Sequence, residues 1–378
     1  MTIFTTFGNR DMTEARDIAG IGIPFAAGVA AGMVLLPVLP ARTVAFCTPG
    51  LLAAAGFFLL LYRTRWPFPA LRGAVAGIFL LAGIFCAANG ALTGGPWSGT
   101  PEGWAAAAAG RLKDAIDAIP YSSETHRALV KALLTGDRSG LGREVTATFR
   151  TSGAAHLLAL SGLHLGVLYL LFVRLTLPLG NSRPARILRY AGILSAAGFY
   201  VCMTGSSPSI VRAFLFILLN ETCRLTGRER QPVRVLLAAL TLQLAFRPDV
   251  VSSVGFQLSY LAMTGIFLLA PVLESWYPAS GSPLRDRWNP MRKIWKGASL
   301  TLSCQLFTAP VVWFRFHTFP KYFLLTNLIA MPLTSGIMLL SVLTIVLSAC
   351  GICPAWLVAL DDRAVALLLD TLGIISRM

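Results

Sequence analysis

The chain has 378 residues, of which 55% are hydrophobic and 13% charged, and its formal net charge is +15. Soluble domains carry about 25% charged residues, so this composition excludes an ordinary soluble enzyme and predicts that most of the chain lies in hydrocarbon. The positive charge fits nucleic acid, anionic lipid or the charge pattern of a membrane protein. Its distribution along the chain separates these cases.

The seven cysteines are odd in number and most lie far apart in apolar runs, which excludes a disulfide framework. Only Cys350 and Cys353 have the spacing of a metal or redox pair, and no second pair accompanies them. We interpret them as small residues at the end of a span. We therefore predict no metal site and no cofactor.

Apolar runs of roughly 20 residues, long enough to cross a bilayer, begin close to the N-terminus. The first, 18–40, is too long for the apolar region of a signal peptide. Pro332 divides the longest run, which predicts a re-entrant piece followed by a span. The predicted spans are 18–40, 43–62, 71–92, 154–179, 187–204, 208–225, 233–247, 250–273, 297–316 and 322–351, followed by an amphipathic or spanning helix at 355–376. The predicted fold class is all-α, a polytopic integral membrane protein with about 10 or 11 transmembrane or re-entrant helices.

Basic residues are unevenly distributed between these spans. With a cytoplasmic N-terminus, most of the Lys and Arg residues between spans fall in cytoplasmic loops, namely 63–72, 174–189, 224–234 and 274–297. The short outer loops hold Arg42, Arg247, Arg315 and Lys321. This asymmetry predicts a cytoplasmic N-terminus, and it explains most of the net charge without nucleic acid.

Residues 93–151 form a polar stretch that this topology places outside. Trp104–Ile119 has the pattern of an amphipathic helix, and Ser122 or Ser123 can cap a second helix that continues to about Leu134. The predicted organisation is a three-helix membrane anchor over 1–92, this outer-surface amphipathic connector over 93–151, and a channel core over 152–378.

Polar side chains interrupt the apolar run that opens the core. His156, Ser161 and His164 are costly in a membrane, where such groups usually face a bundle interior or a wet cavity. Ser161 and His164 are three positions apart and are expected on one helix face, while Gly162 and Gly166 would let another helix approach closely. These groups line a passage or break the helix, or they form hydrogen bonds between helices. A serine–histidine hydrolase is a third interpretation, for which the sequence offers no clear carboxylate to orient the histidine.

Arg212 follows a turn that contains Gly205 and several serines. Ser206 or Ser207 can cap a helix that Pro208 opens, which puts Arg212 about one turn inside the outer end of a span. A guanidinium there needs an anion, a carbonyl or water, and the helix N-terminus adds partial positive charge. The position suits phosphate, although a side chain that reaches up to the interface would have the same pattern.

Two further polar stretches follow. Gln257 and Tyr260 belong to a stripe of polar and aromatic residues that suits a wet passage with stacking surfaces, or interhelical hydrogen bonds. Further on, Gln305, Arg315 and Asn327 lie in a stretch whose prolines, Pro310 and Pro332, are expected to break helices. Its aromatic residues alternate with Arg315, His317 and Lys321, which fits a surface for single-stranded nucleic acid or an interfacial aromatic belt.

Together these stretches resemble, in the same order, the ComEC family of bacterial competence proteins. The similar segments are HLLALSGLHLG (156–166), GSSPSIVRA (205–213), GFQLSYLAMTGI (255–266) and QLFTAPVVWFRFHTFPKYFLLTNLIAMPL (305–333). The resemblance spans roughly 125–351 and implies an inner-membrane channel that takes DNA into the cytoplasm as a single strand. The residues predicted to line the DNA path are His156, Ser161, His164, Arg212, Gln257, Tyr260, Gln305, Arg315 and Asn327.

Two features of many family members are not matched. The chain has no HxHxDH pattern of a metallo-β-lactamase-like domain, so the resemblance does not carry over nuclease activity. The stretch 93–151 is too short for an OB-fold domain with its linkers. The expectation is the membrane core alone, which a separate nuclease and DNA receptor would complement.

The sequence also lacks a Walker A motif and has only four histidines, so we predict no ATP hydrolysis, no His-rich metal centre and no catalytic residues. The predicted function is transport of single-stranded DNA across the bacterial cytoplasmic membrane during natural transformation. The predicted partners are the DNA strand, the lipid bilayer, a separate nuclease, a DNA receptor and a cytoplasmic ATP-driven helicase, with a homo-oligomer left open. The alternative is a secondary transporter of a small anionic solute, which would use Arg212 in an occluded pocket.

Overall fold

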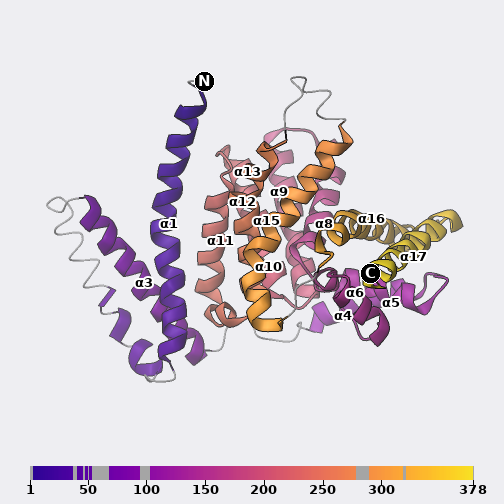
Figure 1. Ribbon diagram of the computed structural model, residues 1–378, viewed down its shortest axis with the longest axis horizontal. Helices are drawn as coiled ribbons and strands as arrows, with labels where there is room; N and C mark the ends of the chain where they lie inside the picture. Colours follow the sequence, from indigo (N-terminus) through magenta and orange to yellow (C-terminus); the bar gives the residue numbers. More distant parts are fainter. Residues whose placement is uncertain are drawn as a thin grey trace. The chain divides into compact units, whose positions relative to one another are not determined.

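The computed structural model describes residues 3–36, 41–45, 47–49, 51–52, 68–93, 103–277, 289–317 and 321–377 (Figure 1). All regular elements within these ranges are helices, which confirms the predicted all-α fold class. The chain divides into two compact units. Unit 1 contains Met1–Gly99 and Leu218–Tyr260, and unit 2 contains Thr100–Ile217 and Leu261–Met378. The predicted boundaries at 92 and 151 stay a prediction.

Five helices in the described residues are long and apolar enough to cross a membrane, so the protein is a polytopic membrane protein. They are Gly73–Leu92, Gly162–Leu179, Val254–Ser275, Pro290–Phe316 and Phe323–Ala349, and shorter apolar helices occupy Ala19–Leu35 and Pro232–Phe246. Helices also form at the predicted spans 187–204 and 208–225, but neither is among these five. The predicted span 43–62 and the predicted loop 63–72 lie largely outside the described residues.

Unit 1 is built on a crossing of two helices at glycine. The helix α1 (Ile3–Leu35) packs along α3 (Phe68–Thr93) and α11 (Pro232–Phe246), with the short η2 (Pro248–Ser252) beside them. A Cβ added to Gly28 would overlap the backbone of Leu80, and one added to Gly83 would overlap the backbone of Phe25. The two backbones are therefore in contact, as in other small-residue crossings of membrane helices.

Unit 2 contains a group of helices that carries most of the predicted site residues. Three of them share an apolar interface that buries Leu165, Ile193 and Ile210 almost completely. The members are α7 (Ala155–Leu158), α8 (Gly162–Leu175), η1 (Leu177–Leu179), α9 (Arg183–Met203), the first half of α10 (Pro208–Thr226), the last part of α12 (Val254–Leu268), α13 (Ala270–Ser275) and α15 (Pro290–Phe316). The predicted break at Pro310 does not occur, because α15 continues through it.

The two helices that the sequence predicts in the connector form, and a third, unpredicted helix follows them. The helix α4 (Gly103–Asp117) is followed by α5 (Glu124–Thr135) and α6 (Arg143–Thr151). Ser123 caps α5 by accepting the Thr125 N–H, and Gly136 ends it in the left-handed conformation with a φ of 79°. The Tyr200 hydroxyl of α9 donates to the Leu134 carbonyl at 2.9 Å, which joins this connector to the end of α9 that leads into the turn before α10.

The last two helices, α16 (Phe323–Ala349) and α17 (Ala355–Arg377), pack together and run across the direction of α9 and α15 within unit 2 (Figure 1). The prediction that Pro332 separates a re-entrant piece from a span is wrong, because α16 passes through Pro332 without interruption. One missing N–H bond at a proline is tolerated where packing compensates. That packing is an apolar core shared with the connector, which includes Leu133, Phe149, Met338 and Leu368.

Candidate functional site at the start of helix α8

The predicted span 154–179 is interrupted at its polar residues. The short α7 ends at Leu158, and α8 begins only at Gly162. Ser161 is the N-cap of α8, and its hydroxyl accepts the Leu163 N–H at 3.3 Å. The predicted break is therefore confirmed, whereas the expectation that Ser161 and His164 share a helix face is wrong, because Ser161 precedes the helix.

His164 completes this cap from the third helical position, where glutamate or glutamine is usual. Its Nδ1 accepts the backbone N–H of Ser161 at 3.2 Å and lies 3.0 Å from the Ser161 hydroxyl. Because Nδ1 accepts a backbone N–H, the proton of the neutral ring must be on Nε2. The side chain is fully buried, and Nε2 has no hydrogen-bond partner among the described residues. The start of α8 thus presents a buried N–H donor that has no acceptor in the described part of the chain.

Arg212 of α10 reaches the same helix end. Its side chain is buried, with 7% of its surface exposed. A Cβ added to Gly162 would lie 3.1 Å from the Arg212 Nη2 atom and 3.5 Å from the Ala213 Cβ, so Gly162 leaves room for the guanidinium. The turn before α10 contains two left-handed residues, Gly205 with φ 79° and Ser206 with φ 52°. This strained corner sets where α10 begins and hence where Arg212 lies.

The guanidinium and the helix end have the same sign of charge. A helix N-terminus carries roughly half a positive elementary charge, which disfavours a cation and favours an anion. Arg212 packs against Gly162, the first residue of α8, where that partial charge resides. The Arg212 guanidinium, the N-terminus of α8 and the His164 Nε2 donor together form an electropositive spot. We call the residues that form it the α8 polar cluster: Ser161, Gly162, His164 and Arg212.

Helix α15 carries one residue that interacts electrostatically with this cluster. Cys304 interacts electrostatically with Arg212, and its thiol lies 3.9 Å from the Ala262 carbonyl oxygen. Gly265 lets α12 approach closely, because a Cβ there would overlap the Ser303 backbone. Gln305, one of the predicted lining residues, is half-buried next to Cys304 on α15.

The remaining predicted residues are more scattered. His156 is exposed on α7, with Nδ1 3.2 Å from the Gly153 carbonyl oxygen. Asn327 is half-buried on α16, and its Oδ1 has no hydrogen-bond partner in the described part of the chain. Arg315 is exposed at the last turn of α15.

Gln257 and Tyr260 belong to unit 1, and both make hydrogen bonds within it. The Gln257 amide donates to the Val251 carbonyl at 2.9 Å, and the Tyr260 hydroxyl donates to the Gln243 side chain at 2.9 Å. These contacts agree with the alternative interpretation of that stretch, in which the polar groups connect local structure. Their predicted role in a DNA path stays a prediction.

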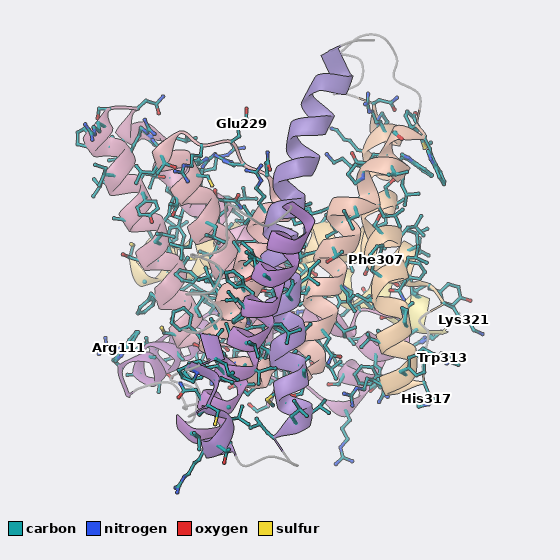
Figure 2. All side chains as sticks on the ribbon, turned by 90° about the vertical axis from the view of Figure 1, so that its left-hand side faces the viewer. Arg111, Glu229, Phe307, Trp313, His317 and Lys321 are labelled. Carbon is teal, nitrogen blue, oxygen red and sulfur yellow. The ribbon has the colours of Figure 1, made fainter. Side chains whose placement is uncertain are left out.

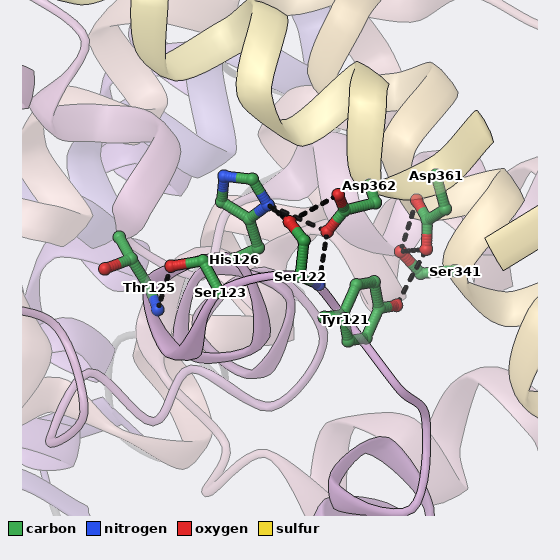
Figure 3. A network of polar contacts seen from close by, with 8 residues as sticks. All are labelled: Tyr121, Ser122, Ser123, Thr125, His126, Ser341, Asp361 and Asp362. Atoms are coloured by element: carbon green, nitrogen blue, oxygen red, sulfur yellow. Dashed lines mark hydrogen bonds and ion pairs between the residues drawn. The ribbon is translucent and has the colours of Figure 1, made fainter. Parts of the chain in front are cut away.

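A second polar network was missed by the sequence interpretation (Figure 3). Asp361 of α17 is fully buried, and it accepts hydrogen bonds from the Tyr121 hydroxyl at 2.7 Å and the Ser341 hydroxyl at 2.9 Å. Its neighbour Asp362 accepts from the Ser122 hydroxyl at 2.6 Å and contacts His126 Nδ1 at 2.8 Å. We call these six residues the α17 clasp, because they fix α17 to the connector and to α16.

The two aspartates of the α17 clasp have opposite electrostatic environments. Burial raises the pKa of Asp361 above its ordinary value, although the hydrogen bonds from Tyr121 and Ser341 act against this. Burial also acts to raise the pKa of Asp362, but hydrogen bonds from Ser122 and His126 outweigh it and lower that pKa. One signal for Asp361 was available in the sequence, since it falls on the apolar stripe of α17 with Leu357, Val365 and Leu368.

Comparison with known proteins places these features in a family context. Residues 133–378 match the family model described as competence protein. The chain is 29% identical over 206 residues to ComE operon protein 3 of Bacillus subtilis (strain 168), an alignment that covers 54% of this chain and 24% of that protein. It is 27% identical over 248 residues to uncharacterized protein YcaI of Escherichia coli (strain K12), covering 64% of this chain and 32% of that protein.

A third relative is an uncharacterized protein of Aquifex aeolicus (strain VF5), 32% identical over 149 residues, which is 39% of this chain and 34% of that protein. The alignments thus span between 24% and 34% of the length of these curated relatives. No solved structure matches the chain.

Proposed function

This chain belongs to the competence protein family, and from that premise we propose that it passes single-stranded DNA across the bacterial cytoplasmic membrane during natural transformation. Three features support the proposal: the family, the apolar helices that make the protein polytopic, and the electropositive α8 polar cluster. In this proposal the N-terminus is cytoplasmic, and the connector, the turn before α10 and the start of α8 face the outside.

The α8 polar cluster is the observation that carries the proposal. The Arg212 guanidinium and the N-terminus of α8 are both positive and lie together, so the spot that they share favours an anion. A DNA phosphate would supply negative charge to the guanidinium and an acceptor to the His164 Nε2 proton. The planar guanidinium can contact two phosphate oxygens at once, which suits a phosphodiester.

The chain itself is proposed to perform no chemistry. The Ser161 hydroxyl and His164 Nδ1 are 3.0 Å apart, which meets the distance that a serine–histidine hydrolase would require. A hydrolase also needs a carboxylate on the other ring nitrogen, and His164 Nε2 has no such partner among the described residues. We therefore propose that separate proteins supply the remaining steps. A DNA receptor and a nuclease deliver the single strand to this chain, and a cytoplasmic ATP-driven helicase pulls it inward.

The test is entry of labelled DNA into cells that lack this chain, complemented with wild type or with Arg212→Ala. A charge-assisted phosphate contact is worth about 1.5–3 kcal/mol, so Arg212→Ala should lower entry about 10- to 100-fold at equal protein abundance. The control is Arg183→Ala, an exposed arginine at the start of α9, which should leave entry near wild type. Normal DNA entry in the deletion strain would refute the proposed transport. Wild-type entry with Arg212→Ala would refute only the phosphate role.

A small-anion transporter is the second candidate, and the burial of Arg212 favours it, because a single buried guanidinium can also hold one small anion. The same strains separate the two functions. A transporter predicts that the deletion abolishes uptake of a small organic anion and leaves DNA entry intact. The DNA channel predicts the reverse.

A further inference from the structure

The C-terminal end of α15, which the proposed topology places outside, exposes most of its side chains. Trp313, Phe314 and Phe316 are exposed to 55%, 78% and 49%, and Arg315 and His317 beside them are also exposed. Successive residues of a helix point about 100° apart, so these five side chains surround the whole circumference of its last turn. Figure 2 shows Trp313, His317 and Lys321 projecting outward near this end, with Phe307 further along the helix. We call Trp313, Phe314, Arg315, Phe316, His317 and Lys321 the α15 tip.

The α15 tip is cationic as well as aromatic. The sequence has no Asp or Glu from Asn289 to Leu360, so no acidic residue of α15 or α16 neutralises Arg315 and Lys321. His317 ends the helix in the left-handed conformation with φ 51°, and its ring lies 6.5 Å from that of Trp313 at an angle of 47°. Exposed rings beside positive charges that no acidic residue of α15 or α16 neutralises fit a partner that has both flat bases and negative charges.

The tip also lies on the same helix as Cys304, which interacts electrostatically with Arg212 of the α8 polar cluster. Cys304, which interacts with Arg212, and Arg315 are 11 positions apart, which is about three turns and brings them to nearly the same face. The axial separation is about 16 Å at 1.5 Å per residue, a span of only a few nucleotides in an extended strand. Half-buried polar residues, Thr308 and Gln305, occupy the helix between them.

We propose that the α15 tip is the receiving platform for the incoming single strand, where bases stack on Trp313 and Phe316 and phosphates contact Arg315 and Lys321 before they reach Arg212. This inference rests on the proposed function and adds a second subsite to it. An interfacial aromatic belt would also expose tryptophan beside arginine. It would not require an exposed last turn that is aligned with Cys304 on a helix pair, α15 and α16, without acidic residues, so the strand is the better occupant.

The experiment uses the full chain in nanodiscs of phosphatidylethanolamine and phosphatidylglycerol with an oligothymidylate that carries 5-iodouracil. Photocrosslinked peptides are mapped by mass spectrometry. We expect crosslinks at the α15 tip and near Arg212. Trp313→Leu should lower crosslinking at the tip about tenfold, the factor for loss of one base–aromatic stack. Trp356→Leu, which removes a tryptophan that is 67% exposed on α17, should leave it unchanged.

A second measurement decides between DNA and lipid. Nanodiscs made with brominated phospholipid quench tryptophans that lie in the bilayer, and the difference between wild type and Trp313→Leu isolates the fluorescence of Trp313. Quenching of the Trp313 fluorescence by oligothymidylate rather than by brominated lipid supports the platform. Quenching by brominated lipid alone, with crosslinks near Arg212 but none at the tip, overturns the platform and leaves the channel standing. A lack of crosslinks both at the α15 tip and near Arg212 would count against both proposals.

Discussion

The α8 polar cluster and the α17 clasp are both buried polar networks of unit 2, but they differ in how completely their hydrogen bonds are satisfied. In the α17 clasp, Asp361 accepts from two hydroxyls, and Asp362 accepts from Ser122 and contacts His126. In the α8 polar cluster, a cation packs against a helix N-terminus, and the His164 Nε2 proton has no acceptor among the described residues. A satisfied network stabilises a fold, whereas an unsatisfied one is retained where a ligand completes it.

The largest effect should come from the clasp. Asp361→Ala leaves the buried hydroxyls of Tyr121 and Ser341 without their acceptor, and we expect the free energy of unfolding to fall by about 3 kcal/mol. Thermal unfolding of the purified protein in detergent measures this loss. Asp370→Ala is the matched control, since Asp370 is exposed on the same helix and should change stability by less than about 0.5 kcal/mol. Equal effects of the two variants would contradict the clasp.

The next largest effect is expected in the α8 polar cluster. Gly162→Ala puts a methyl group 3.1 Å from Arg212 Nη2 and displaces the guanidinium from the start of α8. We expect DNA entry to fall about tenfold, since a shift of one charged contact is worth about 1.4 kcal/mol. Gly166→Ala, one turn further along α8 with nothing within 4 Å of the new Cβ, is the control and should retain entry. If both variants transport normally, the position of Arg212 is not critical.

A third prediction separates stability from function at one residue. Arg212→Met keeps most of the side-chain volume and removes the positive charge beside the helix N-terminus. We expect DNA entry to fall about tenfold at equal protein abundance, because the charge-assisted contact to phosphate is lost. Thermal unfolding of the same variant shows whether the fold is retained. Wild-type entry by a folded Arg212→Met would contradict the phosphate role.

The smallest effect is the pH dependence of the clasp. The raised pKa of Asp361 means that its contribution to stability is present at low pH and is lost as the pH rises through that folded-state pKa. The lowered pKa of Asp362 means the opposite: its contribution is present above the unfolded-state pKa of 3.8 and is lost as the pH falls through the folded-state value.

Asn resembles a protonated carboxyl group, so Asp361→Asn should stabilise relative to wild type increasingly as the pH rises. Asp362→Asn should destabilise near neutral pH, with a cost that shrinks in acid. Melting temperatures measured across a pH series for the two variants test both signs. Parallel curves for the two variants would show that the neighbouring aspartates do not differ in this way.

Local features of this fold could be predicted from sequence because their causes lie within a few residues. Ser123 caps α5 and Gly136 ends it, and the polar run at His156, Ser161 and His164 does break the helix. The clasp could not be predicted, because Tyr121 and Asp361 are 240 positions apart. The continuity of α16 through Pro332 could not be predicted either, because it depends on packing of α16 against the connector, which outweighs one lost hydrogen bond. The closeness of Arg212 to Gly162 likewise depends on how two separate helices meet.

Cys304 gives this molecule an intrinsic probe of water access. Its thiol is free and half-buried, and it interacts electrostatically with Arg212. In a background where the other cysteines are replaced by serine or alanine, a membrane-impermeant maleimide applied to one side of a sealed vesicle would reach Cys304 only through water that connects to that side. The reaction rate with and without bound oligonucleotide would then reveal whether the strand occupies the same aqueous route.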